Sequence, residues 1–168
     1  PCQWVQEGET STSASTSISQ CYASGTVVGS INVGGLVGGA NGSVTDSYAT
    51  GSVQTNVGSG GGLIGLLGSS GVARCWSSGA VGGSGTPQNG FVGSSGVYTV
   101  SQCYWDRLYA AQAAGGATGA TGLMPGQMVD SAVVAAGWDI APVGSGGGRV
   151  WLIDSTSAFS FPHLRGPS

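Results

Sequence analysis

The sequence has few charged residues and no lysine. Asp, Glu, Lys and Arg together make up 7% of the 168 residues, against about 25% in an ordinary soluble domain. The basic residues are Arg74, Arg107, Arg149 and Arg165, and the formal net charge is −3. Because such a chain has no basic stripe to track phosphates or anionic lipids, we expect no nucleic-acid partner.

Long apolar runs and metal-ligand clusters are also missing. Gly and Ser interrupt every apolar stretch, so none approaches the ~18 residues of a membrane span, and we expect no membrane insertion. The chain has one histidine, His163, and four cysteines, Cys2, Cys21, Cys75 and Cys103. These are too few and too poorly spaced for a zinc site, so we expect no metal and no cofactor.

Glycine, in contrast, is abundant, and it recurs in a motif written four times. Gly accounts for 34 residues, roughly three times the usual share of about 7%. The copies begin at Ile18, Val44, Val72 and Val100, so their starts are 26, 28 and 28 residues apart. This period is typical of a solenoid. A flexible Gly/Ser linker is the alternative, but a linker does not keep Val, Ile and Leu at fixed positions over three periods.

The repeat predicts an all-β fold, a parallel β-solenoid (β-helix) of about four coils. A unit of this length cannot bury its own apolar side chains, but it can when stacked on similar units about 4.8 Å away. Parallel crossovers favour a right-handed winding. After the repeats, Trp105, Trp138, Trp151, Phe159 and Phe161 indicate an aromatic-rich C-terminal cap, with at most a short helix beginning near Pro125.

These observations divide the chain into three regions. They are an N-terminal strand or edge segment (1–17), the repeats (18–104, as 18–43, 44–71, 72–99 and the start of a last coil at 100–104), and the capping region (105–168).

Within each coil, the repeat positions predict which side chains face the core. Residues 20, 46, 74 and 102 are Gln, Asp, Arg and Gln, so we expect this position to face water and its neighbours to face inward. The shared glycines Gly25, Gly51 and Gly79 are expected to form a corner with positive φ. The predicted repeat core consists of two adjacent columns, of which strict alternation turns one inward; the columns are Leu36, Leu63 and Phe91, and Val37, Ile64 and Val92.

An aromatic column is the main candidate site. Tyr22, Tyr48, Trp76 and Tyr104 share one repeat position, two residues after the polar one. Facing outward, rings about 4.8 Å apart would form a ladder that stacks on sugar rings or on a neighbouring subunit. The alternative is a bulge that turns the rings into the core or under a loop.

The cysteines suggest two disulfides. Cys75 and Cys103 share a repeat position one period apart, so stacking would bring their Cα atoms to about 4.8 Å, within the disulfide range. Ser47 separates Cys21 from Cys75, which leaves Cys2 as the partner of Cys21. The alternative is four reduced, buried thiols acting as small apolar fillers.

Catalytic groups are sparse, so we expect no enzyme. Asp46 and Arg74 share a repeat position on adjacent coils and are expected to form a weak exposed ion pair. Asp106 and Asp139 follow Trp and are expected to close turns. A catalytic Ser or Cys would need a base, and the sole histidine, His163, stands beside Pro162.

The repeats resemble the GLUG motif, which is named for its Gly-Leu-hydrophobic-Gly core. That core stands here as Gly35–Gly38 and Gly62–Gly65, with Gly90–Gly93 as a variant, and a second family element stands at Tyr48–Val53. The end of the chain is similar to the end of GLUG arrays, with Tyr-Trp-Asp at 104–106, Gly-Leu at 122–123, Gln-Met at 127–128, Gly-Trp-Asp at 137–139, Trp151 and Pro162. Some family members carry peptidase domains, but this chain has no His-Glu-x-x-His.

The resemblance implies a prokaryotic protein that is extracellular or on the cell surface. We therefore expect a non-catalytic structural module, either the shaft of a surface adhesin or a subunit of a self-assembling extracellular fibre. Its partners would be itself, by head-to-tail or lateral assembly, or another surface protein. The alternative is a glycan-binding module that uses the aromatic ladder, and a polysaccharide-active β-helix enzyme is a distant third.

Overall fold

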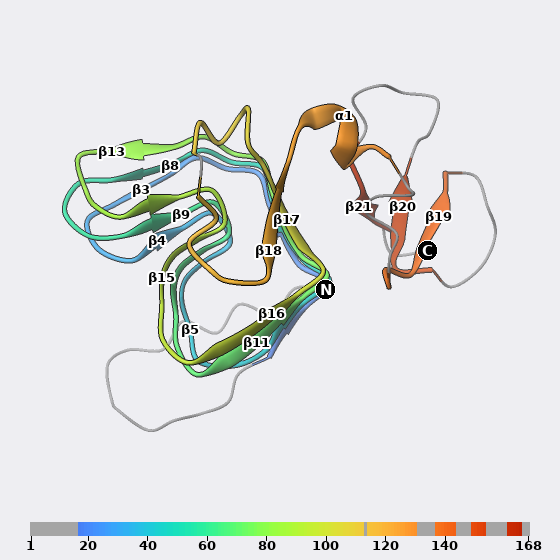
Figure 1. Ribbon diagram of the computed structural model, residues 1–168, viewed down its shortest axis with the longest axis horizontal. Helices are drawn as coiled ribbons and strands as arrows, with labels where there is room; N and C mark the ends of the chain where they lie inside the picture. The colour runs from blue at the N-terminus through green and yellow to red at the C-terminus, as the bar shows by residue number, and fades with distance from the viewer. Residues whose placement is uncertain (1–16, 113, 131–136, 144–148, 154–160, 166–168) are drawn as a thin grey trace.

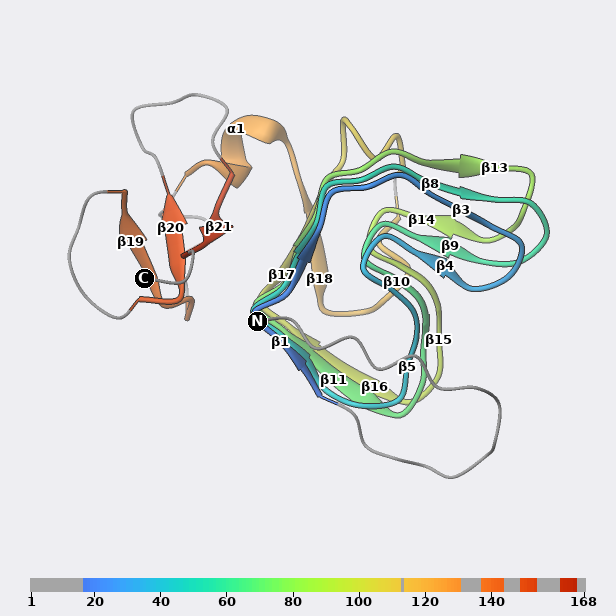
Figure 2. The same ribbon diagram turned by 180° about the vertical axis from the view of Figure 1, so that it is seen from behind.

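The computed structural model describes residues 17–112, 114–130, 137–143, 149–153 and 161–165. In this part of the chain short strands are wound into stacked coils, and five parallel sheets run along the stack (Figures 1 and 2). Sheet A contains β1 (Ile18–Ser19), β6 (Val44–Thr45), β11 (Ser70–Ala73) and β16 (Tyr98–Ser101). Sheet B contains β2 (Tyr22–Ala23), β7 (Tyr48–Ala49), β12 (Trp76–Ser77), β17 (Cys103–Asp106) and β18 (Ala120–Leu123).

Three smaller sheets complete each coil. Sheet C contains β3 (Val27–Gly29), β8 (Val53–Thr55) and β13 (Val81–Gly83), and sheet D contains β4 (Val33–Gly34), β9 (Gly60–Gly61) and β14 (Gln88–Asn89). Sheet E contains β5 (Val37–Ala40), β10 (Ile64–Leu67) and β15 (Val92–Ser95). Figure 1 shows sheets C and D as an arm that projects away from sheet B.

The register is the one that the repeat predicts. Val44 lies between Ile18 and Val72 in parallel pairing, and Val72 pairs in turn with Val100. The parallel β-solenoid is therefore confirmed. It has about three turns rather than four, because sheets C, D and E hold only three strands each. The right-handed winding stays a prediction.

The coils bury a continuous apolar core, and both predicted columns contribute to it. Leu63, Ile64, Phe91 and Val92 all have 0% exposure and lie in one cluster. Strict alternation fails here because the amides of Leu63 and Ile64 both donate to the carbonyl of Phe91, at 2.9 and 3.1 Å. The chain bends at this point, so two consecutive side chains enter the core.

The corner with positive φ is not at the predicted glycines. It lies five residues earlier, at Gln20, Asp46, Arg74 and Gln102, where φ is 54°, 49°, 54° and 54°. Gly51 and Gly79 are needed for a different reason, namely the close approach of each to the preceding coil. A Cβ atom on Gly51 would lie 1.9 Å from the carbonyl oxygen of Gly25, and one on Gly79 would lie 1.8 Å from that of Gly51.

The residues after β17 close the C-terminal end of the solenoid. Val81, Gly90 and Val92, in the third coil, donate amide hydrogen bonds to the carbonyls of Ala110, Ala114 and Gly115. The chain then returns to sheet B as β18, parallel to β17. Residues 107–112 and 114–123, which we assigned to the capping region, thus form an irregular last coil.

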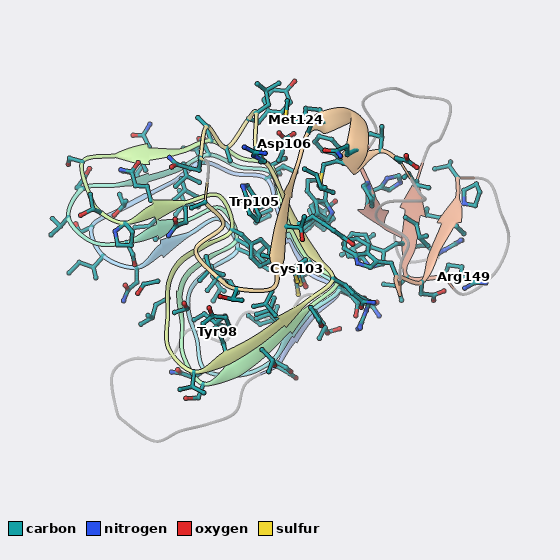
Figure 3. All side chains as sticks on the ribbon, in the orientation of Figure 1. Tyr98, Cys103, Trp105, Asp106, Met124 and Arg149 are labelled. Carbon is teal, nitrogen blue, oxygen red and sulfur yellow. The ribbon has the colours of Figure 1, made fainter. Side chains whose placement is uncertain are left out.

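Trp105 fills the core at this end. It occupies the register position of Ser77 and Ala49, and its ring is buried in the solenoid core (Figure 3). A Cβ atom on Gly90 or Gly115 would lie within 2.5 Å of that ring. The indole therefore fits only because its neighbours have no side chains.

The rest of the capping region lies outside sheet B, on the side away from the arm (Figures 1 and 2). It contains α1 (Pro125–Met128), with Pro125 in its first turn as predicted, followed by β19 (Ile140–Pro142), β20 (Trp151–Ile153) and β21 (His163–Leu164). These strands form a sheet of their own, parallel between β19 and β20 and antiparallel between β20 and β21. We call residues 137–143, 149–153 and 161–165 the C-terminal segment.

Two matched substitutions test the close approach of the coils. Gly79→Ala places a methyl group against the carbonyl of Gly51, and such overpacking costs typically about 1–3 kcal/mol. Gly25→Ala makes the same change at the same repeat position of the first coil, where nothing lies within 4 Å of the new Cβ. We expect urea unfolding to show a clear loss of stability for Gly79→Ala alone, and equal effects would contradict the stacking argument.

Candidate functional site

The four aromatic residues form a ladder along sheet B. The rings of Tyr22 and Tyr48 are 5.2 Å apart with an interplanar angle of 11°, and those of Tyr48 and Trp76 are 4.9 Å apart at 4°. Tyr104 follows in register with Trp76. Because the rings of Tyr22, Tyr48 and Trp76 lie face to face along the stack, each covers the face of its neighbour and presents its edge outward.

The ladder projects from the outer side of sheet B, and the preceding corner explains why. After the residue with positive φ, the next side chain turns into the solenoid core and the following one turns out. Cys75 accordingly belongs to the core cluster of the solenoid, whereas Trp76 belongs to a second cluster on the other side of the sheet.

The C-terminal segment covers most of this ladder. The ring of Trp151 lies 5.9 Å from Tyr48, and Phe161 meets Trp76 edge to face at 5.2 Å. Trp138 contacts both Trp151, at 4.6 Å, and Tyr104, at 5.8 Å. Trp76 and Tyr104 are therefore only 2% and 9% exposed, Tyr48 is half-buried, and Tyr22 remains 61% exposed.

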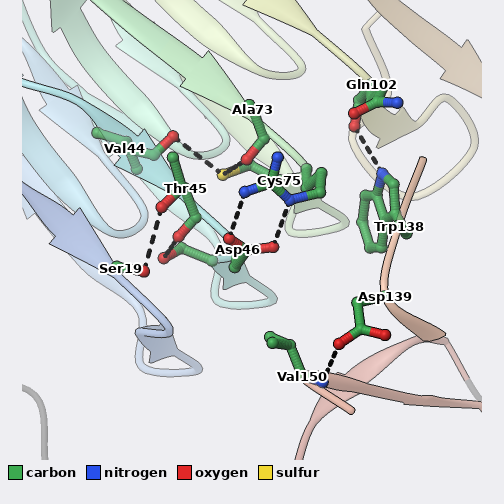
Figure 4. A network of polar contacts seen from close by, with 12 residues as sticks. Ser19, Val44, Thr45, Asp46, Ala73, Cys75, Gln102, Trp138, Asp139 and Val150 are labelled. Carbon is green, nitrogen blue, oxygen red and sulfur yellow. Dashed lines mark hydrogen bonds and ion pairs between the residues drawn. The ribbon is translucent and has the colours of Figure 1, made fainter. Parts of the chain in front are cut away.

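Two indole hydrogen bonds attach the segment to the corner residues. Trp151 Nε1 donates to Asp46 Oδ1 at 3.3 Å, and Trp138 Nε1 donates to the carbonyl of Gln102 at 2.9 Å. Figure 4 shows the second of these bonds beside the network around Asp46. The aromatic count of the sequence signals a cap, but no sequence pattern pairs these tryptophans with the corner.

The Asp46–Arg74 pair is stronger than the weak exposed contact that the sequence predicts. Arg74 Nε and Nη2 donate to the two carboxylate oxygens of Asp46, both at 2.7 Å. The side chain of Arg74 is 31% exposed and that of Asp46 only 11% exposed, because Trp151 lies against the carboxylate. The hydrogen bond to Asp46 raises the pKa of Arg74, so the guanidinium stays charged. A bidentate pair of this kind fixes both side chains.

The tyrosine hydroxyls under the segment are held neutral. Burial raises the pKa of Tyr48 and, likewise, that of Tyr104. Trp76 Nε1 is buried and has no hydrogen-bond partner among the described residues. The arrangement thus supports ring packing and offers no activated nucleophile.

The other two singled-out carboxylates also have structural partners. Asp106 Oδ1 accepts from the amides of Leu108 and Tyr109, at 2.8 and 3.0 Å, and closes a turn as predicted. Asp139 instead accepts from Arg149 Nη1 at 2.6 Å and from the amide of Val150, and the Arg149 hydrogen bond lowers the pKa of Asp139.

His163, the sole histidine of the sequence, lies in β21 with Nδ1 3.4 Å from the carbonyl oxygen of Phe161. Within the described residues no three metal-ligating side chains gather. Among the described residues, the hydrogen bond of His163 is to a backbone carbonyl and not to a nucleophilic side chain.

The predicted Cys75–Cys103 disulfide is wrong, because both residues are free thiols. Stacked residues of parallel coils point their Cα–Cβ bonds the same way, so their Cβ atoms stay about 4.8 Å apart, beyond the ~4.5 Å that a disulfide tolerates. Each thiol instead donates to the carbonyl two residues earlier, Cys75 to Ala73 at 3.3 Å and Cys103 to Ser101 at 3.2 Å.

The same local bond recurs in the second coil, where the hydroxyl of Ser47 donates to the carbonyl of Thr45 at 2.7 Å. The position after the corner thus holds a small hydrogen-bond donor at Ser47, Cys75 and Cys103. Cys2 lies outside the described residues, so the Cys2–Cys21 disulfide stays a prediction.

Removing the carboxylate of Asp46 tests the attachment of the C-terminal segment. Asp46→Ala leaves the Trp151 indole and a partly buried Arg74 without their acceptor, and we expect a loss of about 2 kcal/mol in unfolding free energy. Tryptophan fluorescence during urea unfolding measures it. The matched control is Asp139→Ala, which removes the exposed pair with Arg149 and is expected to change stability little. Equal losses would show that Asp46 has no special role.

The thiol column has its own test. Cys75→Ser keeps a small donor that Ser47 already provides at this position, so we expect a loss below about 1 kcal/mol. Cys75→Leu adds volume to a fully buried site and is expected to cost about 1–3 kcal/mol. Because burial raises the pKa of the Cys75 thiol, alkylation in the native state should also be slow. Rapid native alkylation of Cys75 would contradict the structure.

Comparisons with known proteins point to one motif. The family model described as the GLUG motif matches residues 29–54, a stretch that runs from the end of β3 into β8 and so makes one full turn of the solenoid. No curated protein and no solved structure matches the chain. Within the described residues, no helix is long and apolar enough to cross a membrane. The chain therefore carries the GLUG motif, and its solenoid stacks about three coils of the kind in which that motif lies.

Proposed function

We propose that this chain is a non-catalytic structural module of an extracellular or cell-surface prokaryotic protein, serving as part of an adhesin shaft. The observation that carries the proposal is the stacking of similar coils in five parallel sheets, whose buried apolar side chains form clusters that run along the stack. Repeat units joined in this way extend a chain by a fixed rise per coil, which suits a spacer. The GLUG motif and the low-charge composition support an extracellular setting.

The use of the carboxylates supports a non-catalytic role. Asp46 is held by Arg74 and Trp151, Asp106 by turn amides, and Asp139 by Arg149. Retaining and inverting glycosidases need two carboxyl groups facing one substrate bond across a gap. These three belong to separate structural contacts, so they support a fold rather than a reaction.

The glycan-binding alternative has narrower support. Sugar rings stack on aromatic faces, and the faces within the ladder are covered by neighbouring rings. Tyr22, at the end of the row, is the rung that remains largely exposed. A glycan site here would therefore consist of one ring and not of a ladder.

The closed C-terminal end disfavours the fibre alternative. Head-to-tail growth needs two complementary ends, but Trp105 and residues 107–112 and 114–123 close one of them. The proposed role in an adhesin shaft does not depend on head-to-tail assembly.

Surface labelling tests the proposed location. An antibody raised against the folded chain is expected to label intact producing cells as strongly as permeabilised ones, because the module would lie outside the membrane. A cytoplasmic protein of the same cells serves as the control and should be labelled only after permeabilisation. Labelling of this chain only after permeabilisation would overturn the extracellular assignment.

Activity assays test the proposed role. We expect no cleavage when the purified chain is incubated with a panel of polysaccharides, and cleavage that Asp46→Ala abolishes would establish an enzyme instead. On a glycan array, retention that Tyr22→Ala abolishes would favour the binding module.

A further inference from the structure

Two routes of ring contacts lead to one exposed tyrosine. Along the first, the ring of Trp138 lies 4.6 Å from that of Trp151, and Trp151 lies 5.9 Å from Tyr48. Along the second, Trp76 stacks on Tyr48 at 4.9 Å. Both routes continue from Tyr48 to Tyr22, whose ring is 5.2 Å away. We call the rings of these five residues the ring series.

The ring series runs from the interior of the molecule to the solvent. Its three tryptophans are buried, Tyr48 is half-buried, and Tyr22 is 61% exposed. Burial raises the pKa of Tyr48, so its hydroxyl releases a proton less readily than a hydroxyl in water does. Tyr22 is therefore the member of the series that is best placed to give its hydroxyl proton directly to solvent.

Contact between such rings matters for one-electron oxidation. Tryptophan and tyrosine are among the side chains that lose an electron most readily, and an electron passes between two rings fastest when they are in contact. An oxidised tyrosine also loses its hydroxyl proton, so the radical settles on a ring that has an acceptor for that proton. In the ring series water is that acceptor at the exposed end, so oxidation of a buried ring should end at Tyr22.

We propose that one-electron oxidation of the buried tryptophans passes through Tyr48 to Tyr22, and that Tyr22 is the residue at which two copies of this chain become covalently coupled. Each Tyr22 loses one electron and one proton. A carbon–carbon bond then forms between the two rings, and each ring recovers its hydroxyl by transfer of a ring hydrogen to oxygen. The oxidant is hydrogen peroxide acting through a peroxidase, which takes up two electrons and two protons and becomes two waters.

The surroundings of Tyr22 suit contact between two copies. Residues 18–45 contain no charged residue, so two first coils can meet without like-charge repulsion within this stretch. Tyr109 provides a contrast within the same chain. It is 56% exposed, nearly as much as Tyr22, but its ring contacts no other aromatic ring among the described residues. Exposure alone would make the two tyrosines equivalent, whereas the ring series favours Tyr22.

This inference goes beyond the structural module proposed above and rests on the ring contacts alone. A covalent bond at Tyr22 would fix two modules to each other, whereas the module itself needs no such bond. Surface labelling tests the module, and mapping of the cross-link tests the tyrosine.

Light absorbed by the indoles tests the proposal, because it ionises buried tryptophans whether or not a dissolved oxidant can reach them. The purified chain is flashed at the long-wavelength edge of indole absorption, where tyrosine does not absorb, with a cobalt(III) ammine as irreversible electron acceptor. We expect the absorbance of the tryptophan radical to decay as that of the tyrosine radical rises, at a rate independent of protein concentration. Mass spectrometry of the products should find the dityrosine bond at Tyr22.

Three phenylalanine variants keep each ring and remove its hydroxyl, and circular dichroism checks that each one folds. Tyr22→Phe is expected to lose most of the tyrosine-radical signal and most of the cross-link. Tyr48→Phe is expected to lose most of both as well, because the two routes meet at Tyr48. The matched control Tyr109→Phe should behave as the wild type.

Several results would overturn the proposal. A wild-type chain without dityrosine would do so, as would cross-links shared equally between Tyr22 and Tyr109, because exposure alone would then decide the site. An unchanged yield in Tyr48→Phe would show that oxidation does not pass through the ring series, and an unchanged yield in Tyr22→Phe would show that it does not end there. Mapping in the wild type remains decisive if a variant does not fold.

Discussion

Main-chain hydrogen bonding between coils in register is the constraint on which the rest of this structure depends. Each coil donates to and accepts from the next, as Tyr48 donates to Cys21 and Trp76 donates to Ser47. This bonding fixes the spacing of the coils at about 4.8 Å. Every repeat position must therefore hold a side chain that tolerates a near copy of itself at that distance.

Three kinds of side chain meet this requirement here, each in its own way. Glycine meets it where backbones touch, as at Gly51 and Gly79. Planar rings meet it by stacking, as Tyr48 and Trp76 do at 4.9 Å. Small donors such as Cys75 meet it by bonding within their own coil, which leaves the space between coils to van der Waals contact.

The same constraint explains why the C-terminal segment docks where it does. Stacked rings satisfy one another's faces but leave a row of apolar edges outside sheet B. Covering those edges buries aromatic area, which favours a second layer. The two indole N–H groups then need acceptors as they are buried, and the corner provides them through the carboxylate of Asp46 and the carbonyl of Gln102.

Sequence reasoning predicted the features that repeat and missed those that depend on local geometry. The spacing of Val44 and Val72 was enough to predict parallel stacking. The left-handed corner was missed because non-glycine residues such as Arg74 occupy it, so composition points to the wrong position. Cys75 and Cys103 form no disulfide because their Cα–Cβ bonds point the same way, and the Cα spacing that the sequence predicts says nothing about that direction. The contact between Trp151 and Asp46 joins residues 105 positions apart, and no local pattern encodes it.

The ends of the solenoid also differ at the level of sequence. At the closed end the repeat breaks down, since Trp105 replaces the small residue of earlier coils and fills the space that a further coil would occupy. The first coil shows no such departure, because Cys21, Tyr22 and Gly25 match the positions that stack in later coils. The first coil is therefore marked by the persistence of the repeat, just as the closed end is marked by its loss: a sequence that keeps the stacking pattern continues the solenoid, and one that replaces a small core residue with an indole ends it.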